Sequence, residues 1–348
     1  MSTSRTSGAV REVASGVFAY LQEGGWGFSN AGLIADSGAS LLVDTLYDIG
    51  LTRCMLDELR RVTPAADHIG TLVNTHANGD HCWGNALIEN AKIISSRAAA
   101  AEMAELSPRV MAGLVSGARL VARAGRGTAG LRRLLGRLGI PADVWGTADF
   151  VVDNFGAFDF RGIAFKPPTD TFEGRLHLEV GSKCVELIEV GPAHTKGDVV
   201  VFLPKERVAF TGDILFIGSH PIMWEGPVEN WIRACDRLLD LDVDVFVPGH
   251  GPVTTKEGVR RTKEYWEMLL EVSRAGCAAG ASSDEIATEL HARGFDEWTE
   301  GSRVAVNVDT ICRELRGDRS RRYPLAMLAK MARLERHHAP PEAPTRDD

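Results

Sequence analysis

The chain has 348 residues, of which 44% are hydrophobic and 25% are charged. This length is enough for one large domain, or for a core domain with additions, and for a sizeable buried core. The formal net charge of −8 argues against general nucleic-acid binding, which requires a basic surface. No apolar run approaches the roughly 20 residues that cross a bilayer, and the first residues contain no hydrophobic signal core. We therefore expect a cytoplasmic protein that binds neither membranes nor nucleic acids.

The first hundred residues predict short strands that alternate with helices. Turn residues separate the first apolar runs, as in hairpins. Leucines and a methionine recur at helical spacing between residues 50 and 62, which indicates an amphipathic helix. Hairpins followed by strand–helix alternation indicate a layered α/β fold. Strands are predicted at residues 11–23, 31–35, 40–44, 71–74 and 91–95.

Residues 97–147 have a different composition, rich in Ala, Arg, Leu and Gly, which predicts an insertion of two or three helices. Between Arg97 and Arg137 there are eight Arg and two Glu, a local charge of +6. The simplest interpretation is a solvated helical face. The functional alternatives are a lid over a site, or a dock for an acidic partner such as an acyl carrier protein or the phosphates of coenzyme A.

The rest of the chain predicts a second set of strands and then helices only. A helix at 231–241 and a strand at 243–247 close the β-rich part. We therefore expect a domain over residues 1–260, a helical C-terminal appendage over 261–336, and a polar, Pro-rich disordered tail over 337–348. The predicted strands are Phe150–Val152, Phe158–Phe160, Leu176–Leu178, Val185–Val190, Val199–Leu203 and Val208–Phe210. The predicted helices are 258–276, 283–293 and 303–316, followed by a basic segment at 318–336.

The candidate site is the segment Thr75–Asn85, which follows the predicted strand 71–74. It brings His76, Asn78, Asp80 and His81 within six residues. A loop at a strand end can turn several side chains toward one point, and zinc prefers imidazole and carboxylate ligands. We therefore expect a metal site here rather than surface histidines.

The motif HANGDH resembles the HxHxDH signature of the metallo-β-lactamase superfamily, with Asn78 at the position of the second histidine. Five further segments match the family in order, and the resemblance spans roughly residues 10–260. It implies an αββα sandwich, which agrees with the layered α/β pattern. The matching segments are Ser29–Ile34, Leu42–Thr45, Gly191–Asp198, Phe210–Asp213 and Val247–Pro252.

The resemblance also implies a site for two Zn²⁺ ions. His76 and His194 would hold the first ion, with Asn78 in place of the missing imidazole. Asp80, His81 and His250 would hold the second ion, and Asp213 would bridge the two. Such a pair activates a shared water as hydroxide near neutral pH and polarises a carbonyl, while Asp80 can accept the proton of the water.

Asn78 is the departure from the family pattern. An amide oxygen is a weaker zinc ligand than imidazole, so the first site should bind metal less tightly than the second. Alternatively, Asn78 hydrogen-bonds a metal-bound water instead of ligating. Thr195 and Asp198 are candidates for orienting the imidazoles. Cys82 follows His81 directly, and we expect it to pack beside the site rather than to ligate or react.

Aromatic residues around these motifs predict an apolar substrate pocket. The loop from Ile214 to Asn230 leaves the bridging aspartate and carries Phe216, Met223 and Trp224. Trp26, Phe28 and Trp83 are candidates for the opposite wall, with ordinary core packing as the alternative for each. His220 is a candidate acid or hydrogen-bond donor, with a structural role as its alternative. Such a pocket suits a small hydrophobic acyl or aromatic substrate.

The function that follows is a zinc-dependent hydrolase of a thioester, ester or lactone. The HxNxDH form of the motif and the loop Pro221–Trp231 are similar to the cyclases and thioesterases of aromatic polyketide pathways, which belong to antibiotic biosynthesis. The alternatives are a lactonase, a sulfatase, a glyoxalase II-like hydrolase, or a non-catalytic metal-binding protein of the same fold. A β-lactamase is disfavoured because the sequence shows no secretion signal.

Overall fold

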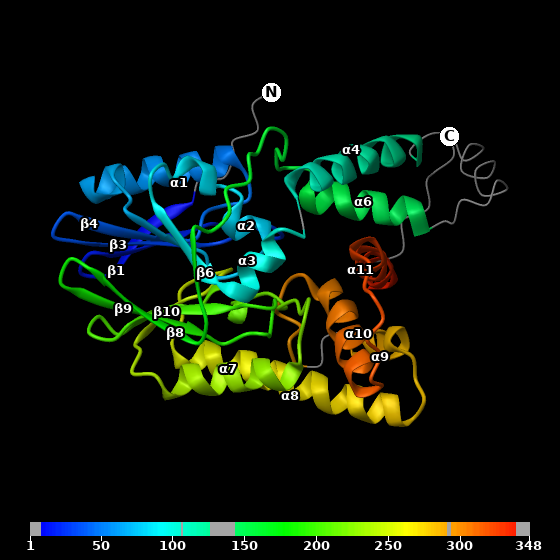
Figure 1. The fold of residues 1–348 in the computed structure, drawn as a ribbon. Helices are drawn as coiled ribbons and strands as arrows, with labels where there is room; N and C mark the ends of the chain where they lie inside the picture. Colours follow the sequence, from blue (N-terminus) through cyan, green and yellow to red (C-terminus); the bar gives the residue numbers. More distant parts are fainter. Residues whose placement is uncertain (1–7, 106, 126–142, 291–293, 339–348) are drawn as a thin grey trace.

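The computed structural model describes residues 8–105, 107–125, 143–290 and 294–338. Two β-sheets pack face to face, and helices cover the outer face of each sheet (Figure 1). This is the expected αββα sandwich. Among the described residues, no helix has both the length and the hydrophobicity that crossing a membrane would need.

The first sheet has the strand order β1-β2-β3-β4-β5-β6-β7. The strands β1 to β4 are antiparallel neighbours, whereas β4, β5, β6 and β7 run parallel. Parallel neighbours need a crossover, and α1 (Ile49–Val62) provides it between β4 and β5. The strand bounds are Ala9–Ala14, Val17–Leu21, Ala31–Asp36, Ala39–Val43, Thr71–Val73, Lys92–Ser96 and Asp170–Phe172.

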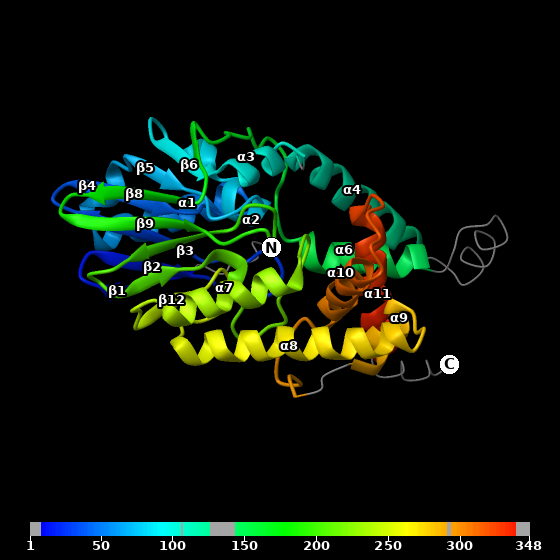
Figure 2. The same ribbon diagram turned by 60° about the horizontal axis from the view of Figure 1, so that its bottom comes forward.

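The second sheet has the order β12-β11-β10-β9-β8, and only its β11–β12 pair is parallel. The helix α7 (Val228–Asp240) connects β11 to β12, and α8 (Lys256–Ala278) packs against α7 (Figures 1 and 2). The strand bounds are Arg175–Val180, Lys183–Glu189, Val199–Leu203, Val208–Phe210 and Val245–Val247.

Alternation along the strands separates the two sides of each sheet. In β10, Val199 and Val201 belong to the core between the sheets, whereas Val200 and Phe202 belong to the core under the helices. Successive side chains of a strand point to opposite faces, so fully apolar strands are buried on both sides. This explains why the strand at 199–203 reads as one continuous apolar run.

The remaining helices gather at one end of the sandwich (Figures 1 and 2). The insertion helix α6 packs against the C-terminal helix α11, and Asp143 of α6 pairs with Arg333 and Arg336. The insertion and the C-terminal region therefore meet in one helical layer. Its members are α4 (Pro108–Gly125), α6 (Asp143–Phe155), α9 (Ser283–Leu290), α10 (Val304–Leu315) and α11 (Pro324–His338), whereas α3 (Arg97–Met103) contacts β6 and β7.

Two predicted strands are wrong. Phe150–Val152 lies inside α6, where Thr147, Ala148, Val151 and Phe155 are buried at helical spacing. A short apolar run fits a buried strand or a buried helix equally well, and here packing against α4 decided. Residues 158–160 form a bend and coil instead of a strand, although the rings of Phe158 and Phe160 are buried.

Some predicted element ends differ from the observed ends, and others lie outside the described residues. The predicted helix 283–293 is described only as far as Leu290, and the predicted tail begins two residues inside α11. The rest of the tail and residues 126–142 of the insertion lie outside the described ranges.

Candidate metal centre

The predicted ligands follow strand ends on one edge of the sandwich. His76 follows β5, and the short helix α2 (Gly79–Cys82) then carries Asp80 and His81. Asp213 lies in η3 (Gly212–Ile214) after β11, and His250 follows β12. Because β11 and β12 are parallel, their carboxyl ends meet at the same edge, which brings Asp213 and His250 together.

The carboxylate of Asp213 lies at the centre of four imidazoles. Its Oδ2 is 3.6 Å from Nε2 of His76, 3.2 Å from Nε2 of His194 and 3.4 Å from Nε2 of His250. Its Oδ1 is 3.1 Å from Nε2 of His81. A single carboxylate within reach of four imidazole nitrogens has the arrangement of a bridging ligand between two cations.

Asp80 completes the second half of the centre. Its Oδ2 is 3.4 Å from Nε2 of His250 and 3.9 Å from Nε2 of His81. Among the described residues, two groups have ligand atoms close enough to hold one ion each. One group is Asp80, His81 and His250, the set predicted for the second metal, and the other is His76, His81 and Asp213. His81 therefore stands in both groups, which the sequence did not predict.

The donor atoms fit a divalent metal such as zinc. Within the described residues, Nε2 of His76, Nε2 of His81 and Oδ1 of Asp213 are buried and form no hydrogen bond. Leaving a buried polar atom without a partner costs free energy, and a metal ion would satisfy all three. Gly249 leaves space for the Asp213 carboxylate, because a Cβ at this position would lie only 1.9 Å from Oδ1 of Asp213.

Each imidazole is held at its other nitrogen, so that Nε2 faces the centre. Fixing Nδ1 sets both the tautomer and the orientation of a ligating histidine. Thr75 donates its hydroxyl hydrogen to Asp44, so the contact between Thr75 Oγ1 and His76 is donated by His76 Nδ1. The Nδ1 contacts are His76 to Thr75 Oγ1 at 2.9 Å, His81 to Asp44 Oδ2 at 2.9 Å, His194 to the Ile222 carbonyl at 2.6 Å and His250 to the Phe28 carbonyl at 3.1 Å.

The model of the metallo-beta-lactamase superfamily matches residues 24–250 of the chain. The chain belongs to this superfamily. Its members are generally metal-dependent hydrolases that hold divalent ions, typically zinc. The histidines and aspartates described above lie within the matched residues and form a candidate metal centre of the superfamily type.

Curated relatives share parts of this chain. A linear primary-alkylsulfatase from Pseudomonas sp. (strain ATCC 19151) is 26% identical over 277 residues, which is 74% of this chain and 50% of the relative. The alpha subunit of 2,4-dinitroanisole O-demethylase from Nocardioides sp. (strain JS1661) is 31% identical over 123 residues, 35% of this chain and 38% of the subunit. The chain thus spans half or less of the length of these relatives.

Solved structures support the fold. A stereoselective inverting sec-alkylsulfatase from Pseudomonas sp. has a TM-score of 0.62 at 15% identity, covering 91% of this chain and 52% of the other. A metallo-beta-lactamase family protein from Thermus thermophilus has a TM-score of 0.57 at 20% identity, covering 90% of this chain and 98% of the other. At these identities the likeness shows the shared fold.

Asp44 is the residue of this superfamily centre that the sequence analysis passed over. It follows β4 and has a positive φ of 62°, and its carboxylate is buried. The backbone N–H and hydroxyl of Thr75 both donate to it at 2.7 Å, and it accepts from His81. It therefore ties the loop of His76 to the ring of His81. The matching segment Leu42–Thr45 contained the signal, since it ends a buried strand in an acidic residue.

Asn78 lies at the first-metal side of the centre. It is the N-cap residue of α2, and its Nδ2 is 2.9 Å from Nε2 of His194. Since Nε2 of His194 is the nitrogen that faces Asp213, the Asn78 amide reaches the ligand position that the motif predicts. The two ends of an amide are nearly equal in shape, so the same side chain can present oxygen to an ion held there.

Asp198 forms hydrogen bonds within the turn that carries His194 and none to an imidazole among the described contacts. Its carboxylate accepts hydrogen bonds from the backbone N–H of Ala193 and from both the N–H and the hydroxyl of Thr195. Burial raises the pKa of Asp198 to about 8 in spite of these bonds. The predicted contact of Thr195 and Asp198 with an imidazole is thus replaced by a contact within the loop.

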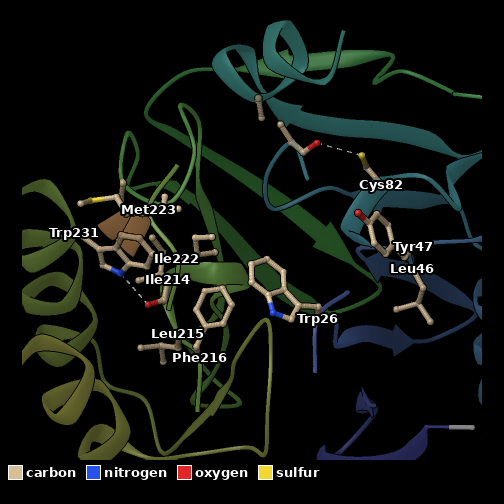
Figure 3. Close-up of a cluster of buried hydrophobic side chains, with 14 of the residues drawn as sticks. Trp26, Leu46, Tyr47, Cys82, Ile214, Leu215, Phe216, Ile222, Met223 and Trp231 are labelled. Atoms are coloured by element: carbon tan, nitrogen blue, oxygen red, sulfur yellow. Dashed lines mark hydrogen bonds between the residues drawn. The ribbon is translucent and has the colours of Figure 1, made fainter. Parts of the chain in front are cut away.

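The predicted substrate residues divide into buried and half-buried groups. Phe216 stacks on the ring of His250 at 4.8 Å, and Trp83 stacks on Tyr47 at 5.2 Å. Figure 3 shows Trp26, Phe216 and Met223 in one apolar cluster with Ile222 and Trp231. These buried residues shape the wall behind the ligands, while Phe28 and Trp224 are half-buried and retain exposed surface.

His220 lies among aromatic rings of the C-terminal region. Its ring packs edge-on against Tyr265 at 5.4 Å and Trp298 at 5.8 Å, and its carbonyl accepts from Arg303. Among the described residues, it belongs to neither ligand group. Cys82 is buried, its Sγ faces the Ala77 carbonyl at 3.6 Å (Figure 3), and burial raises the thiol pKa well above its usual value. Cys82 therefore packs beside the site, as expected.

Proposed function

We propose that this chain hydrolyses a thioester, ester or lactone of a small hydrophobic acyl or aromatic substrate, with a polyketide-type thioesterase or cyclase as the more specific form. The observation that carries the proposal is the Asp213 carboxylate among four imidazoles, with Asp80 beside His81 and His250. When bound there, two divalent ions would lower the pKa of a shared water toward ~7 and polarise the scissile group.

The protein side chains supply orientation, charge and proton transfer. Asp80 is 13% exposed, so its carboxylate can face both an ion and incoming water. Burial would raise the pKa of Asp80, but the histidines around it hold that pKa down to about 2, so the carboxylate is ionised at neutral pH. Phe216 covers the face of His250 and excludes water from behind the ligands. The half-buried rings of Phe28 and Trp224 offer an apolar rim to the acyl group.

The test is a substrate panel with zinc-loaded protein. Acyl thioesters, aryl esters and aromatic lactones should be turned over, and Asp80→Asn should lower kcat by about 100-fold or more because it removes the proton acceptor. His220→Ala is the comparison variant: an unchanged kcat would leave His220 a structural residue, and a pH-dependent loss would support its predicted role as an acid. Inactivity of zinc-loaded protein on the whole panel would favour a non-catalytic metal-binding protein.

A second candidate is hydrolysis of an alkyl sulfate ester. The supporting observation is the 26% identity to a linear primary-alkylsulfatase over 74% of this chain. Alkyl sulfates of increasing chain length belong in the same panel. A kcat/KM for a sulfate ester that exceeds those for all carboxylic esters and thioesters would replace the first proposal by this one.

The partner that we propose is an acyl carrier protein or coenzyme A, docked on the basic insertion. In its described part, α4 exposes Arg109, Arg119 and Arg123. Arg132 and Arg133, which carry more of the predicted charge, lie outside the described residues. Exposed arginines attract acidic proteins and phosphates. Arg109→Glu with Arg123→Glu should raise KM for carrier-bound or coenzyme A thioesters and leave KM for an uncharged short thioester unchanged. If the double variant has the same KM as the wild type for carrier-bound and coenzyme A thioesters, the proposed docking surface is refuted.

A further inference from the structure

The segment Ile222–Gly226 holds the turn of the metal ligand His194. The Ile222 carbonyl accepts from His194 Nδ1 at 2.6 Å. In the other direction, the backbone N–H of Trp224 donates to the His194 carbonyl at 3.0 Å, and that of Gly226 to the Ala193 carbonyl at 2.9 Å. The imidazole of His194 can therefore keep its orientation only while this segment keeps its position.

Two buried side chains of α10 fix that segment. Asn307 Oδ1 accepts from the backbone N–H of Met223 at 2.8 Å, and its Nδ2 donates to the Pro221 carbonyl at 2.8 Å. Thr310 Oγ1 lies 3.1 Å from the Met223 carbonyl and 2.9 Å from the Val306 carbonyl of its own helix, so its one hydrogen is shared between the two acceptors. The peptide groups on both sides of Ile222 are thus bound by side chains of a helix that lies outside the matched residues 24–250.

The Asn307 amide is itself held in one orientation. Its Nδ2 also donates to the hydroxyl of Tyr265 at 2.9 Å, and Tyr265 is fully buried in α8. Arg322 donates to the Trp224 carbonyl at 2.6 Å and to Thr310 Oγ1 at 2.9 Å. A buried polar network with all its bonds made is rigid, and removing one member leaves the others without partners. The segment around Ile222 therefore has little freedom to move away from His194.

We propose that Asn307, assisted by Thr310, is a positioning residue for the metal ligand His194, so that the C-terminal helix α10 sets the zinc affinity of the first metal site. The chain of contacts runs from Asn307 to the backbone of Met223, from the Ile222 carbonyl to His194 Nδ1, and from His194 Nε2 to the centre. The inference rests on the metal centre of the proposed function and on no particular substrate.

The effect should be confined to one of the two sites. His250 and the shared ligand His81 are oriented by the Phe28 carbonyl and by Asp44, which lie in loops of the first sheet and make no contact with Asn307. The first site carries Asn78 where the superfamily pattern has an imidazole, so it relies more on the remaining ligands His76 and His194. Loss of a partner of a ligating histidine typically weakens metal binding ~10–100-fold.

The experiment measures the two zinc affinities by competition with a chromophoric chelator, in the full chain. His194→Ala identifies which of the two affinities belongs to the first site. Asn307→Ala should weaken that affinity about tenfold and Thr310→Val about threefold, while the other affinity changes less than about twofold. Thr310→Ser keeps the hydroxyl and should restore the wild-type value.

The control is Val308→Ala, which removes buried volume from the same helix but no bond to the segment. It should lower thermal stability and leave both zinc affinities unchanged. Equal weakening of both sites, or the same loss in Val308→Ala, would show general loosening and overturn the proposal. If Asn307→Ala does not fold, the test is whether Thr310→Val weakens the first-site zinc affinity while Thr310→Ser does not. A wild-type chain that takes up no zinc would refute the metal centre itself, whereas two zinc ions with unaltered affinities in the variants would refute the positioning alone.

Discussion

Asp213 and burial act in opposite directions on the pKa values of the histidines around the centre. Burial alone would lower the pKa of His250, but the carboxylates of Asp213 and Asp80 outweigh it and raise that pKa to about 9. The same balance raises the pKa of His81 well above its usual value, whereas burial and the charge of His81 hold the pKa of His76 well below it. The metal-free centre therefore holds protons on some imidazoles and none on others.

Zinc binding should consequently strengthen as pH rises. Zinc needs neutral imidazole, and below a pH of about 9 the metal-free protein carries a proton on His250 that binding must displace. The apparent Kd should fall by about tenfold or more for each unit from pH 6 toward pH 8. Chelator competition across this range measures it, and proton release can be checked from the heat of binding in buffers of different ionisation enthalpy. A Kd that is flat between pH 6 and 8 would contradict the displaced proton.

Asn78→His should strengthen the first metal site. An imidazole at this position binds zinc better than an amide, and it would lie beside Nε2 of His194, as the Asn78 amide does. The zinc content after dialysis at limiting free zinc should rise toward two ions per chain. Gln at this position is the matched comparison, since it keeps an amide. If neither variant changes occupancy, the weakness of the amide ligand is not what Asn78 contributes.

At the level of elements, α6 begins inside the predicted insertion 97–147, continues to Phe155, and packs against aromatic residues near the site. Phe150 and Phe155 pack against Trp26 at 5.9 and 5.7 Å, and Phe155 also meets Tyr47. Arg303, the last residue of η4 (Gly301–Arg303) in the C-terminal region, lies over Trp26 at 4.3 Å. The turn that carries Trp26 and Phe28 is thus enclosed by two helical segments far apart in the sequence.

Phe155→Ala should therefore destabilise the whole domain. Truncating a buried phenylalanine removes apolar burial and leaves a cavity, at a cost of about 3–5 kcal/mol in the free energy of unfolding. Denaturant titration measures the change. Val110→Ala is the matched control on α4, because Val110 is 60% exposed and its truncation should stay within about 0.5 kcal/mol. A similar small effect for both would mean that α6 does not contribute to the core.

For the whole molecule, the metal centre joins the two sheets. His76, Asp80 and His81 follow the first sheet, whereas Asp213 and His250 follow the second. The facing carboxylates and buried unbonded atoms there oppose folding unless cations or protons compensate them. A metal ion held by ligands from both sheets would therefore link the two halves of the fold.

Removal of metal should lower the thermal stability of the protein. A ligand that binds only the folded state adds about 4 kcal/mol when its free concentration is about 1,000 times its Kd. Scanning calorimetry with excess zinc, and again after chelation, measures the shift in Tm. His194→Ala should show a smaller shift than the wild type, since it retains the second site. An equal Tm with and without metal would show that the ions do not connect the sheets.

The fold class and the candidate ligands could be predicted from the sequence. His76, Asp80, His81, Asp213 and His250 each follow a predicted strand, and the resemblance of their motifs to the superfamily signature implied that they meet. Local pattern could not decide whether Phe150–Val152 is strand or helix, because both bury the same short apolar run. Packing against α4 and α11 decided it.

The residues that orient the ligands could be identified only from the folded structure. Asp44 and Asn307 carry no spacing that distinguishes them from any buried polar residue, and each acts on a histidine far away in the chain. His220 shows the opposite case: its place in an apolar loop suggested chemistry, and packing put its ring against Tyr265 and Trp298. Ligand motifs are local and can be read in order along the chain. The hydrogen bonds that orient the ligand side chains depend on how the helical layer packs against the sandwich, which local sequence does not show.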